Sequence, residues 1–392
     1  MYQQLHQGQP VVHVPEMGMY LISRYGDVAE ALRDDETYSS CVASKLTSGL
    51  SMNPQRDSVD AVLATGYPHV DSLAWLDPPQ HTRQRQLIVS ALNARRVKLL
   101  EGEISRTASA LVESWDEDAT IEYMTAFSQP LAIAMIAAIL GLTQEETARL
   151  PRWSEAVMNR IGKPLSEEED IAEATQVVEF QHFMAALVET RRKGGHDDFL
   201  GDVVAANLVG DDPISMAELL SLLLTLLVAG HDTSASLMGS LLYELVRRPE
   251  LMQRVRADRS LISRVIEETL RLQAPVSVFT RVTTCPVKVA DTEIAADELV
   301  MLMFGSANVD AEQFADPLAF DIDRPQLRSH VAFGGGIHFC PGAVLAKREA
   351  EIGLNLLLDR FSDIRLAPGA TPEFDSNFRM RRLLSLDIVA RV

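Results

Sequence analysis

The spacing of apolar residues divides the chain into a short β-like start, a long helical middle and a mixed end. Apolar runs at 11–14 and 19–23 surround Pro15 and Gly18, which predicts two short strands. Helical periodicity predicts helices at 27–33, 97–115, 124–140, 144–160, 167–193, 198–209, 260–273 and 341–359. Further strands are expected near 281–289, 299–303 and 383–389. The pattern is typical of a mainly α protein with a small β region.

The longest predicted helix covers 215–246. Ser215 and Glu218 form a capping-box pattern at its start, and Pro249 is expected to stop it. Such a helix spans roughly 48 Å. It is apolar over most of its circumference, so we expect it to cross the protein interior.

A long stretch at 41–75 has no clear periodicity and is expected to be a functional loop. Arg56 and Lys45 within it could anchor a substrate carboxylate, although solvated loop charges are the simpler interpretation. The chain shows no linker of biased composition and no repeat, which favours a single domain over 1–392.

Composition and charge exclude several classes of function. Lys and Arg number 36 and Asp and Glu 55, so the net charge is −19. This charge argues against nucleic acid and against an anionic membrane as partners. The first ten residues have neither an apolar core nor a basic flank, and the three cysteines are far apart, so we expect a cytoplasmic protein without a disulfide framework.

Two predicted helices carry charged residues on faces that should be buried. After Asp77, the expected N-cap, and Pro78, the expected first helical residue, His81 and Arg85 share a face with Ile88 and Leu92. Two buried cations need an anion, unless both side chains extend to the surface.

Glu268 lies on the apolar stripe of the 260–273 helix, with Arg271 three residues further on. This stripe favours a buried structural pair over an exposed one, which would contribute little to stability.

The centre of the long helix contains Ala229-Gly230-His231-Asp232-Thr233-Ser234. Gly and Asp both destabilise an apolar helix, so we expect a kink or local opening here. Asp232 beside the Thr233 hydroxyl suits proton delivery in a buried site. The alternative is a helix break with a satisfied aspartate.

Residues 333–342 read FGGGIHFCPG and place Cys340 at the N-cap edge of a helix expected to begin at Pro341. The helix dipole favours a thiolate there. A thiolate could act as a nucleophile with His338 as base, or as a metal ligand; a lone buried cysteine is the structural alternative.

One ligand accounts for all four features. Haem offers an iron that a cysteine thiolate holds axially, and two propionates that would pair with His81 and Arg85. Its other face would need polar groups, such as those at the centre of the long helix, to manage oxygen.

These motifs resemble the cytochrome P450 family of haem-thiolate monooxygenases, in its soluble bacterial form, over nearly the whole chain. FGGGIHFCPG is similar to the family's haem loop, EETLR at 267–271 to its Glu-x-x-Arg pair, AGHDTS to its oxygen-binding motif and DPPQHTRQR at 77–85 to its propionate-binding helix. The resemblance implies a single helical prism around a buried haem b. It also assigns the cofactor-binding residues His81, Arg85, Arg281, Phe333, His338 and Cys340, with Cys340 as the iron ligand.

The resemblance further implies that Arg324 completes a buried cluster with Glu268 and Arg271, and that Asp232 and Thr233 are the acid–alcohol pair. By family position the substrate pocket is lined by Ala229, His231, Val276, Val278, Phe279 and Phe378. Pro341 lacks an N–H, so one possible donor to the thiolate is absent, and a lower haem potential is expected.

The implied activity is insertion of one oxygen atom of O₂ into an apolar small organic substrate, with hydroxylation as the expected outcome. Electrons would come from a ferredoxin or flavodoxin with its reductase, docking on basic residues that could include Arg95, Arg96, Lys98, Lys347 and Arg348. The alternatives are a peroxygenase that uses H₂O₂ and a noncatalytic haem-thiolate ligand sensor.

Overall fold

The computed structural model describes residues 5–6, 8–42, 53–92, 94–116, 118–162, 164–210 and 212–392. The chain falls into two compact units that interleave along the sequence: Met1–Ser40 with Glu101–Ala132 and Asp232–Val392, and Cys41–Leu100 with Ile133–His231. Three of the four boundaries between the units fall within the helices α6 (Ala94–Glu113), α7 (Gln129–Leu140) and α12 (Met216–Val246), and the fourth lies between Ser40 and Cys41. The single domain expected over 1–392 stays a prediction.

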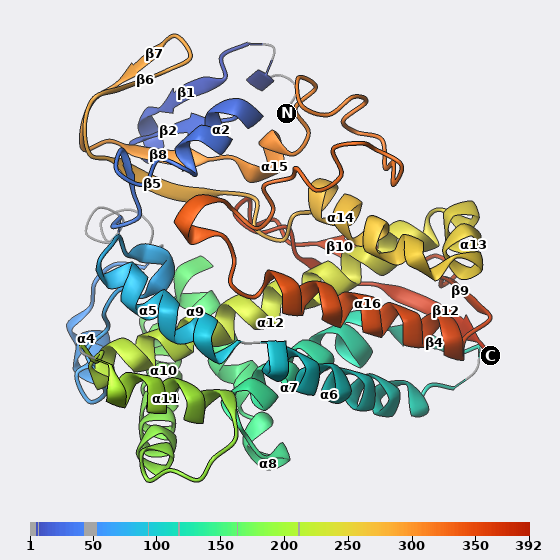
Figure 1. Cartoon of the computed structure of the whole chain (residues 1–392), viewed down its shortest axis with the longest axis horizontal. Helices are drawn as coiled ribbons and strands as arrows, with labels where there is room; N and C mark the ends of the chain where they lie inside the picture. Colours follow the sequence, from blue (N-terminus) through green and yellow to red (C-terminus); the bar gives the residue numbers. More distant parts are fainter. Residues whose placement is uncertain are drawn as a thin grey trace. The chain divides into compact units, whose positions relative to one another are not determined.

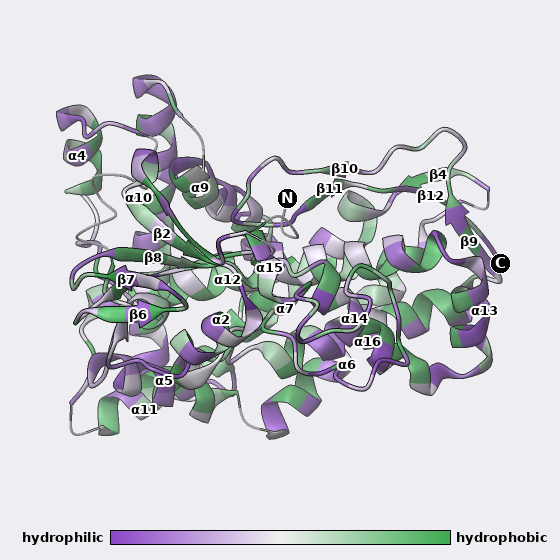
Figure 2. Ribbon diagram, turned by 90° about the horizontal axis from the view of Figure 1, so that it is seen from above, coloured by the Kyte–Doolittle hydropathy of each residue, from purple (hydrophilic) through white to green (hydrophobic). Residues whose placement is uncertain are grey.

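The first unit contains a five-stranded sheet in the order β1-β2-β8-β5-β3, in which only β2 and β8 run parallel. Its strands are β1 (Val11–Val14), β2 (Met19–Ile22), β3 (Tyr38–Ser39), β5 (Phe279–Thr283) and β8 (Leu299–Leu302). Helix α2 (Tyr25–Ala31) packs on this sheet through Val28, which shares a buried cluster with Val300 and Leu302. Figure 2 shows that β2 and β8 are mainly hydrophobic, as strands buried in a core must be.

Smaller sheets complete the β portion of this unit. An antiparallel three-stranded sheet has the order β4-β12-β9, and two hairpins pair β6 with β7 and β10 with β11. These strands are β4 (Thr120–Glu122), β6 (Val287–Val289), β7 (Thr292–Ile294), β9 (Asp363–Leu366), β10 (Glu373–Phe374), β11 (Leu383–Ser385) and β12 (Asp387–Arg391).

The helices that lie wholly in the first unit are α2, α13 (Pro249–Ala257), α14 (Ile262–Leu272), α15 (Phe304–Ala307) and α16 (Ala343–Arg360). α14 packs against α16, and the two helices run close together in Figure 1. Short 3₁₀ turns lie at Pro15–Met17, Arg259–Leu261 and Gly336–His338, and a π-helical turn at Met124–Ser128 leads into α7.

The second unit is helical. It contains α4 (Asp57–Leu63), α5 (Gln80–Ala91), α8 (Gln144–Thr147), α9 (Leu150–Gly162), α10 (Glu167–Arg192) and α11 (Phe199–Val209), with a 3₁₀ turn at Leu73–Trp75. α10 is the central element, because α4, α9 and α11 all pack against it. The mainly α class with a small β portion is therefore confirmed.

Most predicted elements are confirmed within a few residues. The capping box of the long helix is present: the Ser215 backbone N–H donates to Glu218 (2.7 Å), and the Glu218 backbone N–H donates to the Ser215 hydroxyl (3.2 Å). Pro249, however, does more than follow this helix. It is the first residue of α13, a position where its missing N–H needs no partner.

Two further predictions need correction. The 144–160 helix is two helices, since Pro151 fits the start of α9 rather than a helix interior. The 41–75 stretch is not all loop, because it contains α4, whose seven residues are too few to show a helical period. Lys45 lies outside the described residues.

By length and composition alone, α12 is also apolar enough to cross a membrane. The core helix of a globular fold has the same two properties, so they carry little weight. Within each unit this helix is lined by buried leucines: Leu222, Leu223 and Leu227 in one, and Leu237, Leu241 and Leu245 in the other. This burial agrees with the interior position predicted for the helix.

Candidate active site

The glycine-rich loop before α16 is closed by its own backbone. The Cys340 N–H donates to the Phe333 carbonyl at 3.0 Å. Gly334 and Gly336 have left-handed φ angles of 70° and 58°, and a Cβ on Gly336 would collide with the carbonyl of Leu32. The left-handed backbone of both residues, and the close approach of Gly336 to the end of α2, therefore explain these glycines by contacts of the protein alone.

Cys340 is half-buried, and its helix begins later than predicted. α16 begins at Ala343 with Gly342 as N-cap, so Pro341 lies in the turn before the helix. The Gly342 carbonyl accepts from Ala346 at 2.9 Å and so starts the helical ladder. The sulfur stays beside this first turn, since a Cβ on Gly342 would lie 3.9 Å from Sγ.

Two basic residues predicted to bind the cofactor, His338 and Arg281, have polar contacts within the first unit. His338 Nε2 lies 2.9 Å from the hydroxyl oxygen of Ser40. Arg281 is buried on β5, donates to the Thr280 carbonyl at 2.9 Å and lies over the Phe279 ring at 5.0 Å. Phe279, predicted to line the pocket, thus also supports Arg281.

Glu267 and His330 form a buried pair beside the cysteine loop that the sequence reasoning missed. His330 Nε2 lies 2.9 Å from Glu267, while His330 Nδ1 accepts from the Ala332 N–H at 3.3 Å, so Nε2 is the donor. Lys347 Nζ is 3.2 Å from Glu267 and 5.8 Å from the Phe333 ring centroid. Burial raises the pKa of Glu267, but the hydrogen bond from His330 and the charge of Lys347 outweigh it and lower the pKa overall.

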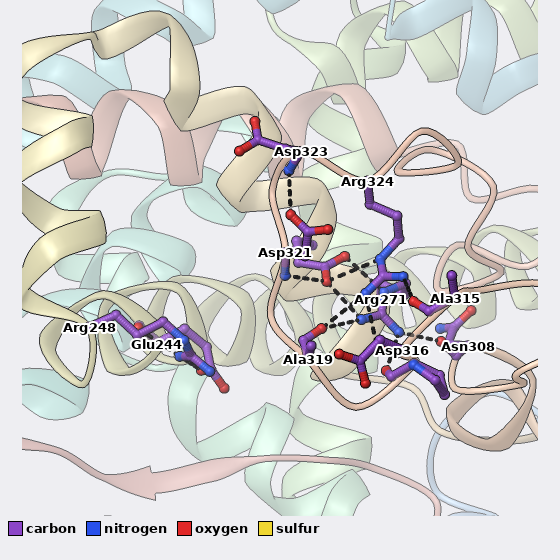
Figure 3. A network of polar contacts seen from close by, with 12 residues as sticks. Glu244, Arg248, Arg271, Asn308, Ala315, Asp316, Ala319, Asp321, Asp323 and Arg324 are labelled. Atoms are coloured by element: carbon purple, nitrogen blue, oxygen red, sulfur yellow. Dashed lines mark hydrogen bonds and ion pairs between the residues drawn. The ribbon is translucent and has the colours of Figure 1, made fainter.

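Glu268 and Arg271 are fully buried and make a bidentate pair, with hydrogen bonds of 2.8 and 2.7 Å. Arg324 approaches the same carboxylate, with its Nε 3.5 Å from Glu268 Oε1. Backbone carbonyls of the 308–319 segment accept from the Nη atoms of both arginines, as Figure 3 shows for Asn308, Ala315, Asp316 and Ala319. The geometry is that of a fixed structural cluster, in which every charge has a partner.

The two residues predicted to deliver protons, Asp232 and Thr233, are consecutive in α12. Asp232 and Thr233 are half-buried, and Asp232 Oδ2 lies 3.7 Å from Arg382 Nη1. The helix is continuous through this motif, so the expected opening is absent. Glycine at position 230 instead allows close packing against α7, because a Cβ there would collide with Ile136.

Glu349 of α16 is a buried acid that the sequence did not reveal. It hydrogen bonds with Ser234 of α12, next to Thr233, and its Oε2 has no hydrogen-bond partner among the described residues. Burial raises the pKa of Glu349 to about 8, and the hydrogen bond with Ser234 offsets this only in part. The carboxyl is therefore mostly protonated at neutral pH.

In the second unit, α5 begins at Gln80 rather than after an Asp77 cap; Pro79 is the N-cap, and the His81 N–H donates to the Asp77 carbonyl at 2.9 Å. His81 is buried and Arg85 is half-buried one turn later, on the predicted shared face. Because no side-chain cap is present, backbone groups alone begin this helix.

Also in this unit, His231 Nδ1 lies 3.3 Å from the Ser154 hydroxyl of α9. Arg56 pairs with buried Asp170 at 3.1 Å and donates to the Leu165 carbonyl at 2.9 Å. A protein carboxylate thus already pairs with Arg56, which argues against the suggestion that this residue anchors a substrate carboxylate.

Three pocket residues predicted from distant parts of the sequence meet in the first unit. Val276 forms a β-bridge with Met380, and the Ser277 N–H donates to the Arg379 carbonyl at 2.8 Å. These contacts bring Val276 and Val278 beside the turn that carries Phe378, whose side chain is exposed. Ala229, also exposed, lies near the middle of α12.

The basic residues considered for partner docking are largely neutralised. Arg95 and Arg96 pair with Asp197, and Arg96 also pairs with Asp202. Lys347 pairs with Glu267, as described above. Arg348 pairs with Glu101 and Glu351 at 2.8 and 2.6 Å. Lys98 is exposed. Because Arg95, Arg96, Lys347 and Arg348 already have acidic partners, these residues argue against a strongly basic docking surface.

Comparison with known proteins decides the family. The family described as Cytochrome P450 matches residues 38–380. The chain belongs to the cytochrome P450 family. Cytochrome P450 107B1 of Saccharopolyspora erythraea is 34% identical over 93% of this chain and 87% of its own length. The 6-deoxyerythronolide B hydroxylase of the same organism is 31% identical over 93% of this chain and 89% of its own.

Solved structures agree with the sequence relatives. The cytochrome P450 CREJ in complex with (4-ethylphenyl) dihydrogen phosphate superposes with a TM-score of 0.91 at 27% identity, covering 100% of this chain and 96% of that one. The P450 fold and the assignment as a P450 monooxygenase are thereby confirmed, and the family implies a haem-iron cofactor.

The residues of this P450 fit such a cofactor. Within the described residues no group of three or more His, Cys, Asp or Glu side chains could hold a metal ion. Cys340 is half-buried beside the start of α16 and offers a single sulfur ligand, which suits an iron whose other ligands a porphyrin would supply. At position 229, α12 carries only a small and exposed alanine side chain.

Proposed function

We propose that this P450 inserts one oxygen atom of O₂ into an apolar small organic substrate, usually as a hydroxyl group. The substrate C–H bond and O₂, with two electrons and two protons, give an alcohol and one water. The observation that carries the proposal is the Asp232–Thr233 pair at the centre of α12, where an acid adjoins an alcohol. A peroxygenase has no need of such a pair, because peroxide brings its own protons and electrons.

The residues of the chain take distinct parts in this proposal. In this proposal Cys340 would hold the iron of haem b as a thiolate, and His81, Arg85, Arg281 and His338 would pair with its propionates. When bound, the haem supplies oxygen activation, which thiolate ligation favours. Asp232 and Thr233 hold and pass protons through ordered water, and Phe333 packs near the sulfur.

The apolar substrate is supported by the side chains around the 378 turn. Val276, Val278 and Phe279 are aliphatic or aromatic, and Arg56, considered as a carboxylate anchor, is taken by Asp170. A panel of neutral apolar compounds, each with a carboxylate analogue, tests this point by the spectral shift of the haem iron. Neutral compounds should shift the spectrum at lower concentration; tighter binding of the carboxylates would contradict the apolar assignment.

We further propose that electrons come from a separate ferredoxin or flavodoxin with its reductase, and that the protein works in the cytoplasm as one domain. The decisive experiment supplies ¹⁸O₂, NADPH and each partner to the purified holoprotein. We expect one ¹⁸O atom per product and faster turnover than with H₂O₂ alone. Faster turnover with H₂O₂ would favour a peroxygenase, and absence of any product across the panel would favour a ligand sensor.

A further inference from the structure

The β10–β11 hairpin carries a cation that reaches the predicted proton-delivery acid. Arg382 lies just before β11, opposite Asp375, and the Asp375 N–H donates to the Arg382 carbonyl at 2.9 Å. Its guanidinium lies between two carboxylates: Nη1 is 3.7 Å from Asp232 Oδ2, and Nε is 3.6 Å from Asp375 Oδ2. The Arg382 guanidinium thus lies within ion-pair distance of two carboxylates, one on α12 and one in its own hairpin.

The two carboxylates are held differently. Asp375 Oδ1 accepts the Asn377 N–H at 3.0 Å, so the turn itself fixes this side chain. Asp232 lies on α12, outside the hairpin. Both separations from Arg382 exceed hydrogen-bond length, which makes the attraction electrostatic and adjustable without breaking a directional bond. A small rotation of the Arg382 side chain would therefore bring the guanidinium closer to one carboxylate and further from the other.

The backbone that carries Arg382 is fixed at several points. The Arg381 N–H donates to the Pro275 carbonyl at 2.9 Å, and the Ser277 N–H donates to the Arg379 carbonyl at 2.8 Å. The Arg381 side chain also hydrogen bonds with Gln273 at the end of α14. The same turn exposes Phe378 beside Val276. A ligand that contacts Phe378 would therefore press on the segment that aims Arg382.

We propose that Arg382 is a positioning residue for Asp232, and that it links the substrate-contacting turn at 375–382 to proton delivery. The inference rests on the proposed function, because it needs Asp232 to carry protons. Arg382 itself touches neither substrate nor reacting atoms in this scheme.

The competing explanation is that Arg382 only stabilises the β10–β11 hairpin through its ion pair with Asp375. Asp375→Asn removes the hairpin ion pair but leaves Arg382 facing Asp232, whereas Arg382→Gln removes both. Arg365→Gln on β9 is a matched loss of an exposed arginine, whose side chain is 3.8 Å from Asp363. Arg382→Lys keeps the charge and should restore function in part.

The test measures kcat, KM and the fraction of NADPH electrons recovered in product, with the holoprotein and the best compound from the spectral panel. We expect Arg382→Gln to lower kcat and the coupled fraction about fivefold while KM changes less than about twofold. Arg382→Lys should recover at least half of the loss, and Asp375→Asn and Arg365→Gln should stay close to the parent protein.

Asp232→Asn separates this inference from the proposed function. In the Asp232→Asn background, adding Arg382→Gln should cause no further loss, since both act on one path. An additive loss, or an equal loss from Asp375→Asn, would overturn the inference and assign Arg382 to the hairpin. Normal coupling in Asp232→Asn alone would overturn the proton-delivery role and the inference with it. If Asp232→Asn lowers the fraction of electrons recovered in product but Arg382→Gln leaves it unchanged, only the inference about Arg382 is overturned.

Discussion

Glu349 on α16 hydrogen bonds with Ser234 on α12 and so joins the helix that follows Cys340 to the helix that carries Thr233. Both side chains are buried. A carboxyl in this position holds its proton near neutral pH, because burial disfavours the charged form. The contact gives the first unit a buried titratable group whose hydrogen-bond partner on α12 follows Thr233 in the chain.

Glu349 should make stability fall with rising pH. Its pKa rises from 4.5 to about 8 on folding, so the folded state binds more protons than the unfolded state between these values. Its stabilising protonation is complete below pH 4.5 and is lost as pH rises through 8. We expect Glu349→Gln to remove a slope of up to about 1.4 kcal/mol per pH unit.

Urea unfolding of the holoprotein at several pH values between about 5 and 8 measures this slope. Glu351→Gln, on the same helix but partly exposed, is the control and should keep the slope of the parent protein. Parallel curves for Glu349→Gln and the parent would contradict the raised pKa.

Breaking the Glu268–Arg271 pair should prevent stable folding. Glu268→Gln leaves two buried arginines short of an anion, and such a loss costs about 3–5 kcal/mol. Arg271→Lys should also be costly, since lysine cannot make the bidentate contact or reach all the carbonyls that Arg271 serves.

The yield of soluble protein and its CO-difference spectrum after reduction measure this effect. Arg254→Gln removes an exposed pair with Asp323 and should change stability by less than about 1 kcal/mol. Wild-type yield and spectrum from Glu268→Gln would show that the cluster is dispensable.

Thr233→Ala should uncouple oxygen consumption from product formation. Removal of a proton-transferring hydroxyl typically lowers a rate by about 100-fold, and the oxygen consumed would then appear as peroxide or water. Product formed with H₂O₂ should be affected much less, because the peroxide already carries the protons. Measuring NADPH, O₂ and product together checks this; full coupling in Thr233→Ala would exclude the hydroxyl from proton delivery.

Pro341→Ala should raise the haem reduction potential. Pro341 lies in the turn between Cys340 and the N-cap Gly342, and alanine there adds an N–H that can donate toward the sulfur. Less negative charge then remains on the thiolate. Spectroelectrochemical titration measures the potential, and Val344→Ala, an exposed position on α16, serves as control. An unchanged or lower potential in Pro341→Ala would contradict the argument.

The sequence by itself determined the helices, the family and the candidate residues for each role. Periodicity locates a helix of several turns, as in α10 and α12, because each turn repeats the same apolar face. The haem-loop motif worked for a similar reason: its glycines, histidine and cysteine are adjacent in the chain, so local geometry suffices to relate them. Short elements escaped, and α4 shows why, since its seven residues repeat the face too few times.

Only the tertiary structure decided which polar and charged groups from distant parts of the sequence contact one another. Nothing in the spacing of Ser234 and Glu349 relates them, yet burial between two helices raises the pKa of that carboxyl. Asp170 holding Arg56, and Arg382 lying between Asp232 and Asp375, depend equally on packing. Electrostatic partners follow distance and burial in space, which a linear pattern does not encode.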